Sequence, residues 1–302
     1  MRFLRNAILI GVILLLLEGA MGARPTVAAP GATRMLFPLV RSLDGPGCRP
    51  VDGEWYDLIP VAQPSPDPAV PVEWHPDINL ALRGYRDTAS YLGLVEYGGD
   101  TDPGAPRLQT MFAGARFPGI ASVHQVGEWD GNWPGVYGVY PITSPEVTLI
   151  KVFTSPEQVL YVPYRGPEVF HDTLTGQHYV AMVLYATHER LTLVFTRDDH
   201  IINGYALHIE GICVDPRLQA AYRTAVAEGR GRLPGLRYGQ AIGRSRASTL
   251  GLAIRDTGQF LDPRSGKDWW QGVQLTGASL PYIDASNEPW FIERQNRLHG
   301  VD

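Results

Sequence analysis

The feature that most constrains this chain is a series of short apolar or alternating segments between residues 147 and 210. They occupy residues 147–153, 158–164, 179–187, 190–196 and 201–210, with polar residues between them. The junctions at 188–189 and 197–200 are short enough to be tight hairpin turns. Strands joined in this way pair antiparallel, so the series predicts a mainly β fold, an antiparallel β-sandwich or half-open barrel.

The composition agrees with a turn-rich β fold and bears on partners. The 302 residues include 33 Gly and 25 Pro, which favour turns and short strands over long helices. The formal net charge of -5 gives no electrostatic reason to expect nucleic acid as a partner.

The first 23 residues have the order of a secretory signal peptide. Arg2 and Arg5 precede an apolar run at 7–17, which small residues follow before position 24. The run is shorter than the roughly 20 apolar residues of a transmembrane helix. We therefore expect a secreted or extracytoplasmic protein without a membrane span after signal cleavage, the alternative being an uncleaved N-terminal anchor.

The chain has two cysteines, Cys48 and Cys213, both beyond the predicted signal peptide. In an oxidising compartment two lone cysteines often pair, so we expect a disulfide between them. The alternative is two separate thiols, since Cys213 lies in an apolar context.

Composition also divides the rest of the chain. Residues 24–71 form an N-terminal arm that ends in a proline-rich linker at 60–71, whose composition favours extended chain. Residues 72–270 form the β domain, with an insertion near 86–146, and 271–302 form a C-terminal tail.

A single helix is expected near 215–229, connecting parts of the β domain. Asp215 is a suitable N-cap, Pro216 fits the first turn, and Gly229 ends the pattern. The alternation of Ile78, Leu80 and Leu82 predicts instead a strand with one buried face. Further strands are expected at 91–97 and 120–126. The aromatic loop at 129–138 either stacks against a carbohydrate or caps the core.

Several segments resemble lysostaphin-type (LytM-like) zinc endopeptidases, which have the duplicated-hybrid-motif fold. The family's turn of the form GQ-x-IG matches residues 239–243, and its strand H-x-H-F-E-I-R matches 249–255. Its closing V-D-P resembles 261–263, its Y-x-H-L segment resembles 204–210, and its H-x-G-x-D-I-A segment resembles 75–81. The resemblance spans roughly residues 74–265 and is interrupted by about 60 residues after the first segment.

The resemblance implies a zinc site whose residues are mostly missing here. The catalytic His and the zinc ligand of H-x-H are replaced by Thr249 and Gly251, and the family's ligand Asp by Asn79. Glycine has no side-chain donor, while a catalytic zinc takes three protein ligands and a water. The chain thus resembles a pseudoenzyme, with His208 as a candidate for the family's additional active-site His.

Alternation along the last matching strand separates a core face from a groove face. Leu250, Leu252 and Ile254 share the apolar face, whereas the opposite face carries small residues. Small side chains there either leave space for a peptide or glycan or allow close packing, which we favour. The predicted groove-lining residues are Thr249, Gly251, Ala253, His208 and Glu210.

Only weak candidates exist for another metal site that could replace the missing zinc site. One comprises His75 and Asp77 (with Glu73 nearby) together with His208, and a second comprises His171, Asp172 and His178. Neither has a spacing that fixes a ligand face, as H-E-x-x-H does. We therefore expect no cofactor, and zinc only if the metal site is rearranged.

Together these features predict an exported cell-envelope protein with a non-catalytic domain. It would act as a binding or regulatory module for peptidoglycan or another envelope glycan or peptide. The alternatives are an active metallopeptidase or cell-wall hydrolase with a rearranged metal site, and a purely structural extracellular domain.

Overall fold

A computed structural model describes residues 47–130, 137–273 and 280–301, which belong to a compact unit beginning at Asp44. The predicted signal peptide and most of the aromatic loop at 129–138 lie outside these residues. Within the described part, no helix has the length and apolar character needed to cross a membrane.

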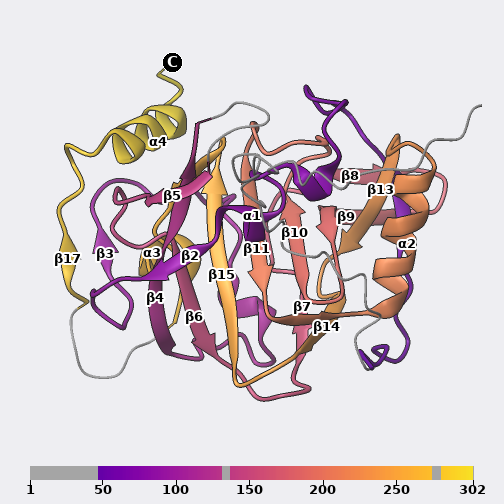
Figure 1. Cartoon of the computed structure of the whole chain (residues 1–302), viewed down its shortest axis with the longest axis horizontal. Coiled ribbons are helices and arrows are strands. Elements are labelled where there is room, and N and C mark those ends of the chain that lie inside the picture. The colour runs from indigo at the N-terminus through magenta and orange to yellow at the C-terminus, as the bar shows by residue number, and fades with distance from the viewer. Residues whose placement is uncertain (1–46, 131–136, 274–279, 302) are drawn as a thin grey trace, which may run out of the picture. The chain divides into compact units, whose positions relative to one another are not determined.

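The predicted mainly β, antiparallel fold is confirmed. A large antiparallel sheet, with strands of different lengths, lies at its centre (Figure 1). Its main path runs β1 (Asp57–Pro60), β13 (Arg232–Arg237), β9 (Gln177–Ala186), β10 (Arg190–Val194), β11 (Tyr205–Glu210), β15 (Thr249–Asp256), β6 (Leu149–Phe153), β4 (Ile120–Trp129) and β2 (Tyr85–Asp87). Strands β16 (Gln259–Leu261), β5 (Tyr137–Pro141) and β8 (Phe170–Asp172) extend it at β15, β4 and β9. The β9–β10 hairpin turns at 187–189, as the sequence predicts.

Two smaller sheets complete the β structure of the described residues. One contains β12 (Ile212–Val214), β14 (Ala241–Ser245) and β7 (Val159–Tyr161), so the segment 158–164 pairs outside the large sheet. The other pairs β17 (Tyr282–Ile283) with β3 (Glu96–Tyr97) in parallel, and β3 is all that forms of the strand expected at 91–97.

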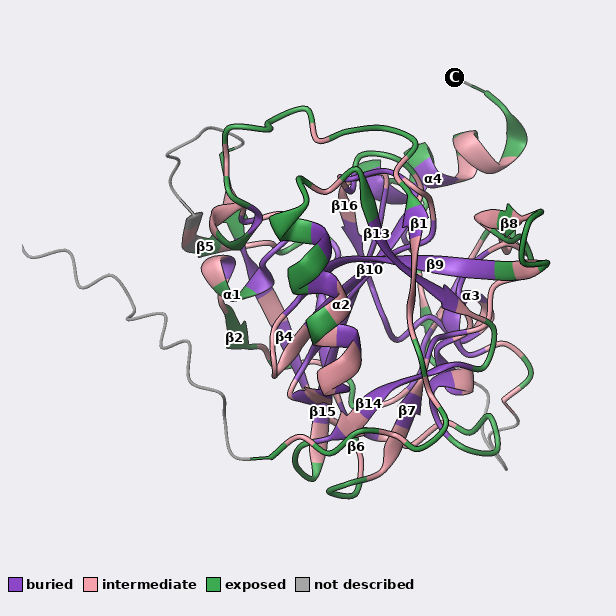
Figure 2. Cartoon of the chain, turned by 90° about the vertical axis from the view of Figure 1, so that its right-hand side faces the viewer, coloured by how far each residue is buried: buried purple, intermediate pink, exposed green. Residues whose placement is uncertain are grey.

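The helix predicted near 215–229 is α2 (Pro216–Ala227). The Asp215 carboxylate caps it by accepting a 2.8 Å hydrogen bond from the Arg217 backbone N–H. Leu218, Tyr222 and Ala225 form its buried face, whereas the outer face is exposed (Figure 2). The other described α-helices, which the sequence did not predict, are α1 (Leu80–Arg83), α3 (Gly266–Trp269) and α4 (Pro289–His299). Short 3-10 helices form at Val72–Trp74 and Leu108–Met111.

The strand expected over 78–82 was a wrong prediction, because the chain turns there and forms α1. The Asn79 backbone N–H bonds to the His75 carbonyl, and the Gly84 N–H bonds to the Leu80 carbonyl. Gly84 ends the helix with φ +65°, a conformation that side chains disfavour. Ile78 and Leu80 are still buried, but a tight turn rather than a strand points them inward.

Part of the predicted N-terminal arm belongs to the sheet, since β1 pairs antiparallel with β13. Cys48, which precedes β1 in the same arm, is joined to Cys213 in β12 by a disulfide. The tail residues Trp290 and Phe291 are buried in α4. The main core contains Leu250, Leu252 and Ile254 of β15. A second, smaller cluster lies on the opposite face of β15 and consists of Leu80, Val126, Leu149, Ala253 and Phe260.

Candidate functional site

The predicted groove-lining residues lie on neighbouring strands in matching register. His208 is opposite Ala253, and Glu210 is opposite Gly251, in the antiparallel pair β11–β15. Side chains of directly opposed residues project from the same face of a sheet. Thr249 shares the Gly251 and Ala253 face by alternation, and it pairs with Phe153 of β6. We call the set Thr249, Gly251, Ala253, His208 and Glu210 the polar face.

The polar face is closed at His208, Glu210, Gly251 and Ala253, and only Thr249 at its end is partly exposed. Ala253 is 0% and His208 1% exposed, and a Cβ added to Gly251 would lie 3.0 Å from the Glu210 Cβ. The absence of a side chain at Gly251 therefore leaves the space that the Glu210 side chain occupies. The arrangement corresponds to close packing and not to a groove with room for a peptide.

Residues 75–83 cover the polar face (Figure 1). The Thr192 hydroxyl donates a 2.8 Å hydrogen bond to the Ile78 carbonyl. Arg255 Nη1 donates to the Asp77 carboxylate at 2.7 Å, and Arg83 pairs with the same carboxylate. A segment far away in sequence is thus tied to β10 and β15 by polar contacts.

The Asp77–Arg83–Arg255 triad is an ionic cluster with both arginines buried. Burial raises the pKa of Asp77, but the Arg255 and Arg83 guanidiniums outweigh it and lower that pKa to about 2. Both guanidiniums also face the Phe260 ring, at 4.3 and 5.4 Å from its centroid. The carboxylate is therefore held ionised by two permanent cations.

His208 lies beside this triad and is neutral. Its Nδ1 is 3.1 Å from the Thr192 hydroxyl oxygen. Since that hydroxyl donates to Ile78, the oxygen accepts from an Nδ1–H, which leaves Nε2 as the unprotonated nitrogen. Burial, reinforced by the Arg255 and Arg83 charges, lowers the pKa of His208 to about 3. Nε2 is buried without a hydrogen-bond partner, so His208 has no access to a solvent-borne substrate.

His75 serves the turn that carries Asp77. Its Nδ1 accepts a 3.2 Å hydrogen bond from the Asp77 backbone N–H, and its ring meets the Trp129 ring edge-on. Burial lowers the pKa of His75, although the carboxylates of Asp77 and Asp67 act in the opposite direction. The residues of the weak metal candidate thus have structural partners of their own.

The structure does not bring His75, Asp77 and His208 together as a group of close ligands in the part of the chain that it describes. Across residues 47–130, 137–273 and 280–301, the group of His, Cys, Asp and Glu ligands close enough to hold an ion is Glu168, His171 and His178. It shares no residue with the set His75, Asp77 and His208. The sequence paired His171 and His178 with Asp172, whereas the structure supplies Glu168 instead.

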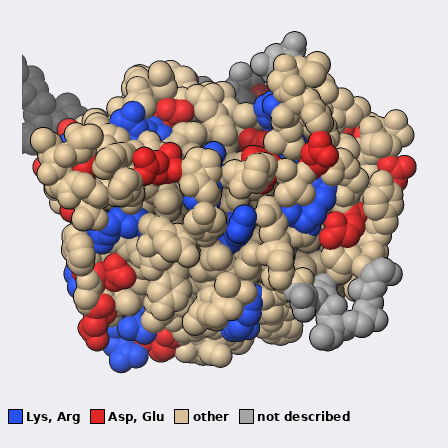
Figure 3. Space-filling model, turned by 180° about the vertical axis from the view of Figure 1, so that it is seen from behind, with Lys and Arg blue, Asp and Glu red and all other residues tan. Residues whose placement is uncertain are grey.

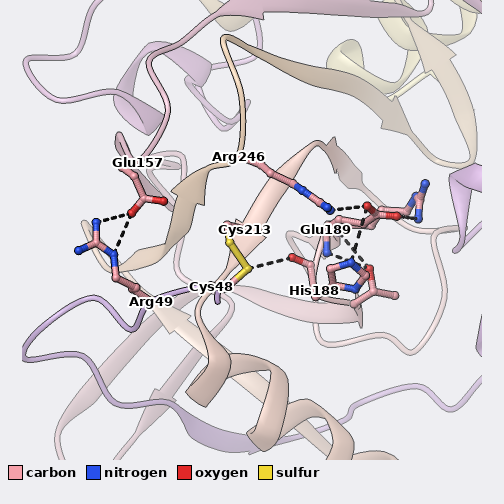
Figure 4. The surroundings of a disulfide bond; sticks show 9 residues. Cys48, Arg49, Glu157, His188, Glu189, Cys213 and Arg246 are labelled. Atoms are coloured by element: carbon pink, nitrogen blue, oxygen red, sulfur yellow. Dashed lines mark hydrogen bonds and ion pairs between the residues drawn. A yellow bond between two sulfur atoms is a disulfide. The ribbon is translucent and has the colours of Figure 1, made fainter. Parts of the chain in front are cut away.

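An ionic network links Glu210, at the end of the polar face, to Glu189. Figure 4 shows Glu189 and its partner Arg246 near the disulfide. Arg190 Nε donates to Glu210 at 2.8 Å, and Arg190 also contacts Glu189, which pairs with Arg246. Burial raises the pKa of Glu210 to about 7, although Arg190 acts in the opposite direction. The Cys48 sulfur lies 3.6 Å from the His188 carbonyl oxygen, beside this network.

A cleft of about 380 Å³ lies elsewhere, around α3 and β3, and no sequence pattern predicted it. The residues that line it include Trp270, whose indole N–H donates a 2.9 Å hydrogen bond to the Pro263 carbonyl. Glu96 and Lys267 supply charges of opposite sign. Burial, followed by the Asp268 charge, raises the pKa of Glu96. The lining residues are Leu94, Glu96, Thr101, Gly266, Lys267, Trp270, Gln271, Gly272, Val273 and Leu280.

Comparison with known proteins adds no assignment, since no family model matches the chain and no curated protein sequence matches it significantly. The distribution of charge on the surface does not indicate a class of partner either. On the face shown in Figure 3, acidic and basic side chains are interspersed, without a continuous patch of one sign.

Proposed function

We propose that this chain is an exported cell-envelope protein whose lysostaphin-peptidase-like domain binds peptidoglycan or a related envelope ligand without cleaving it. The observation that carries the non-catalytic part is the closed polar face. Gly251 stands where the family has a zinc ligand, and Glu210 occupies the adjacent space.

The charges around the polar face also support this proposal. Zn²⁺ carries a double positive charge, and its protein ligands are neutral imidazoles or anionic thiolates and carboxylates. Beside His208 the nearest charged groups include the Arg83 and Arg255 guanidiniums, and their anionic partner Asp77 is already shared between them. A zinc ion placed there would be repelled by the two guanidiniums, and the Asp77 carboxylate is already paired with both of them.

The ligand site that we propose is the cleft around α3 and β3. It combines an apolar wall with the Glu96 carboxylate and the Lys267 ammonium. Lys267 Nζ donates 3.0 Å hydrogen bonds to the Asp100 carbonyl and to Asp268, which fix its position. Pockets of this size with a few placed charges suit small polar ligands, and peptide stems of a cell wall carry both amines and carboxylates.

Co-sedimentation of the purified full chain with peptidoglycan sacculi tests this function. We expect binding that Glu96→Gln and Lys267→Met each weaken at least fivefold, while the exposed control Glu228→Gln leaves it unchanged. We also expect no release of soluble wall fragments, with or without a chelator. Chelator-sensitive release would overturn the non-catalytic proposal. Absence of binding, or binding indifferent to both cleft variants, would overturn the assignment of the cleft.

A further inference from the structure

We propose that Glu168, His171 and His178 form a surface binding site for a divalent transition-metal ion such as Zn²⁺. The site is separate from the polar face and from the cleft, and it does not depend on the proposed function. The ligand atoms of the three side chains all lie within 4.8 Å of one another.

The two histidines come together through strand pairing. His171 of β8 is directly opposite His178 of β9, and their rings stack with centroids 4.1 Å apart. Glu168 reaches the same place from just before β8 and hydrogen-bonds His178 Nδ1. Direct cross-strand neighbours keep their side chains on one face, so the pairing itself holds both imidazoles together.

The hairpin that carries these residues is anchored at both ends. At its tip, the Asp172 carboxylate accepts the Leu174 N–H at 2.9 Å and the Asp172 carbonyl accepts the Gly176 N–H. At its base, the buried Tyr179 stacks on Phe170 and donates a 3.0 Å hydrogen bond to Asp57. The backbone positions of the ligands are therefore fixed before an ion arrives.

The donor set suits a borderline metal ion. Two imidazoles and one carboxylate are a ligand set that proteins use for zinc with an open fourth position. All three residues are exposed, with the side chains of His178 and Glu168 at 59% and 44%. Solvent can therefore deliver the ion and complete its coordination with water. A hard ion such as Ca²⁺ prefers six or more oxygen ligands, which this group does not offer.

Binding requires a small local adjustment. Ligands of a tetrahedral zinc at 2.0–2.1 Å lie about 3.3 Å from each other, so the side chains must close by about 1.5 Å at most. The stacked rings must also turn so that their lone pairs converge, and rotation about such terminal torsions is soft. The ion then takes the place of the hydrogen bond between Glu168 and His178, and the imidazole of His178 binds it through Nδ1 as the neutral tautomer that carries its proton on Nε2.

Zinc titration of the chelator-treated full chain by calorimetry tests the site. We expect one tightly bound Zn²⁺ per chain and a higher Tm of the loaded protein. His171→Ala and His178→Ala should each weaken binding at least tenfold, and Glu168→Gln less strongly. The control is His299→Ala, which removes an exposed histidine from α4 and should change nothing.

Two results would overturn the proposal: no stoichiometric binding by the wild-type chain, or unchanged affinity in the double variant His171→Ala/His178→Ala. A loss of zinc binding through unfolding can be recognised, because the Tm of each metal-free variant is measured alongside. Both histidines are exposed, so their replacement should leave the fold intact. The double variant also separates this site from the proposed function. Its binding to sacculi should equal that of the wild type, whereas the cleft variants should bind zinc normally.

Discussion

Arg255 donates a 2.7 Å hydrogen bond to Asp77, a residue 178 positions earlier in the chain. The bond fastens the covering segment 75–83 to β15 over the polar face, at the place where His208 lies opposite Ala253. With Arg83 on the same carboxylate, it turns that place into a closed ionic cluster.

Replacing Asp77 with Asn should destabilise the fold strongly. The change leaves two buried guanidiniums without their anion, and breaking a buried pair in this way costs about 3–5 kcal/mol. Urea unfolding measures the difference. The control Asp67→Asn changes a more exposed carboxylate and should cost less than about 0.5 kcal/mol. A loss below about 1 kcal/mol for Asp77→Asn would contradict the role of the triad.

His208 should make the protein less stable as the pH falls from about 6.5 toward 3. Its pKa is lowered from 6.5 to about 3 in the folded chain, so between these values the unfolded chain binds more protons. The stabilising contribution is complete above 6.5 and is lost as the pH falls. Urea unfolding of wild type and His208→Gln across this range should give a difference that shrinks with acidification.

The contribution of Glu210 to stability changes with pH in the opposite direction to that of His208, so the two contributions must be measured separately. Its raised pKa of about 7 means that the folded chain holds a proton that the unfolded chain has lost above about 4.5. Its contribution therefore diminishes as the pH rises from 4.5 to 7. Comparing each variant with the wild type cancels the other group. A pH-independent difference for His208→Gln would refute the assignment.

Gly251→Ala should destabilise the protein by about 1–3 kcal/mol, the usual cost of overpacking a core. The new Cβ would lie 3.0 Å from the Glu210 Cβ. Gly231→Ala is the matched control, since its added Cβ meets nothing within 4 Å. Equal unfolding midpoints in urea for the two variants would show that the polar face has spare room after all.

Reduction of the Cys48–Cys213 disulfide should cost about 3–5 kcal/mol, because the bond closes a loop of 165 residues. Urea unfolding with and without reductant measures the change. The double variant Cys48→Ser/Cys213→Ser should match the reduced wild type and should not respond to reductant. A reductant effect that persists in this variant would point to another cause.

Local patterns predicted the elements whose chemistry is local. Helix α2 followed from its cap Asp215 and its terminal glycine, and the β9–β10 hairpin followed from alternation on both sides of a short turn. The segment 78–82 was mispredicted because three apolar residues in alternation fit a strand and a short turn equally well. The hydrogen bonds of His75 and Gly84 decided between them.

For the site residues, too, local patterns predicted some features and tertiary contacts decided the others. Alternation alone placed Gly251 and Ala253 on one face, but whether that face is a groove or a packed layer depends on what covers it. The covering segment joins it through Asp77 and Arg255. Strand pairing brings His171 and His178 together, and Glu168 joins them from just before β8. The cleft around Trp270 likewise combines residues from β3 and α3.

By itself, the sequence determined the strand-rich fold and the position of α2, because these follow from residue type and short-range periodicity. Tertiary structure alone decided that the polar face is closed and that Glu168, rather than Asp172, accompanies the two histidines. The reason is physical: burial, ion pairing and ligand geometry depend on distances between segments far apart in sequence, which strand order and packing set.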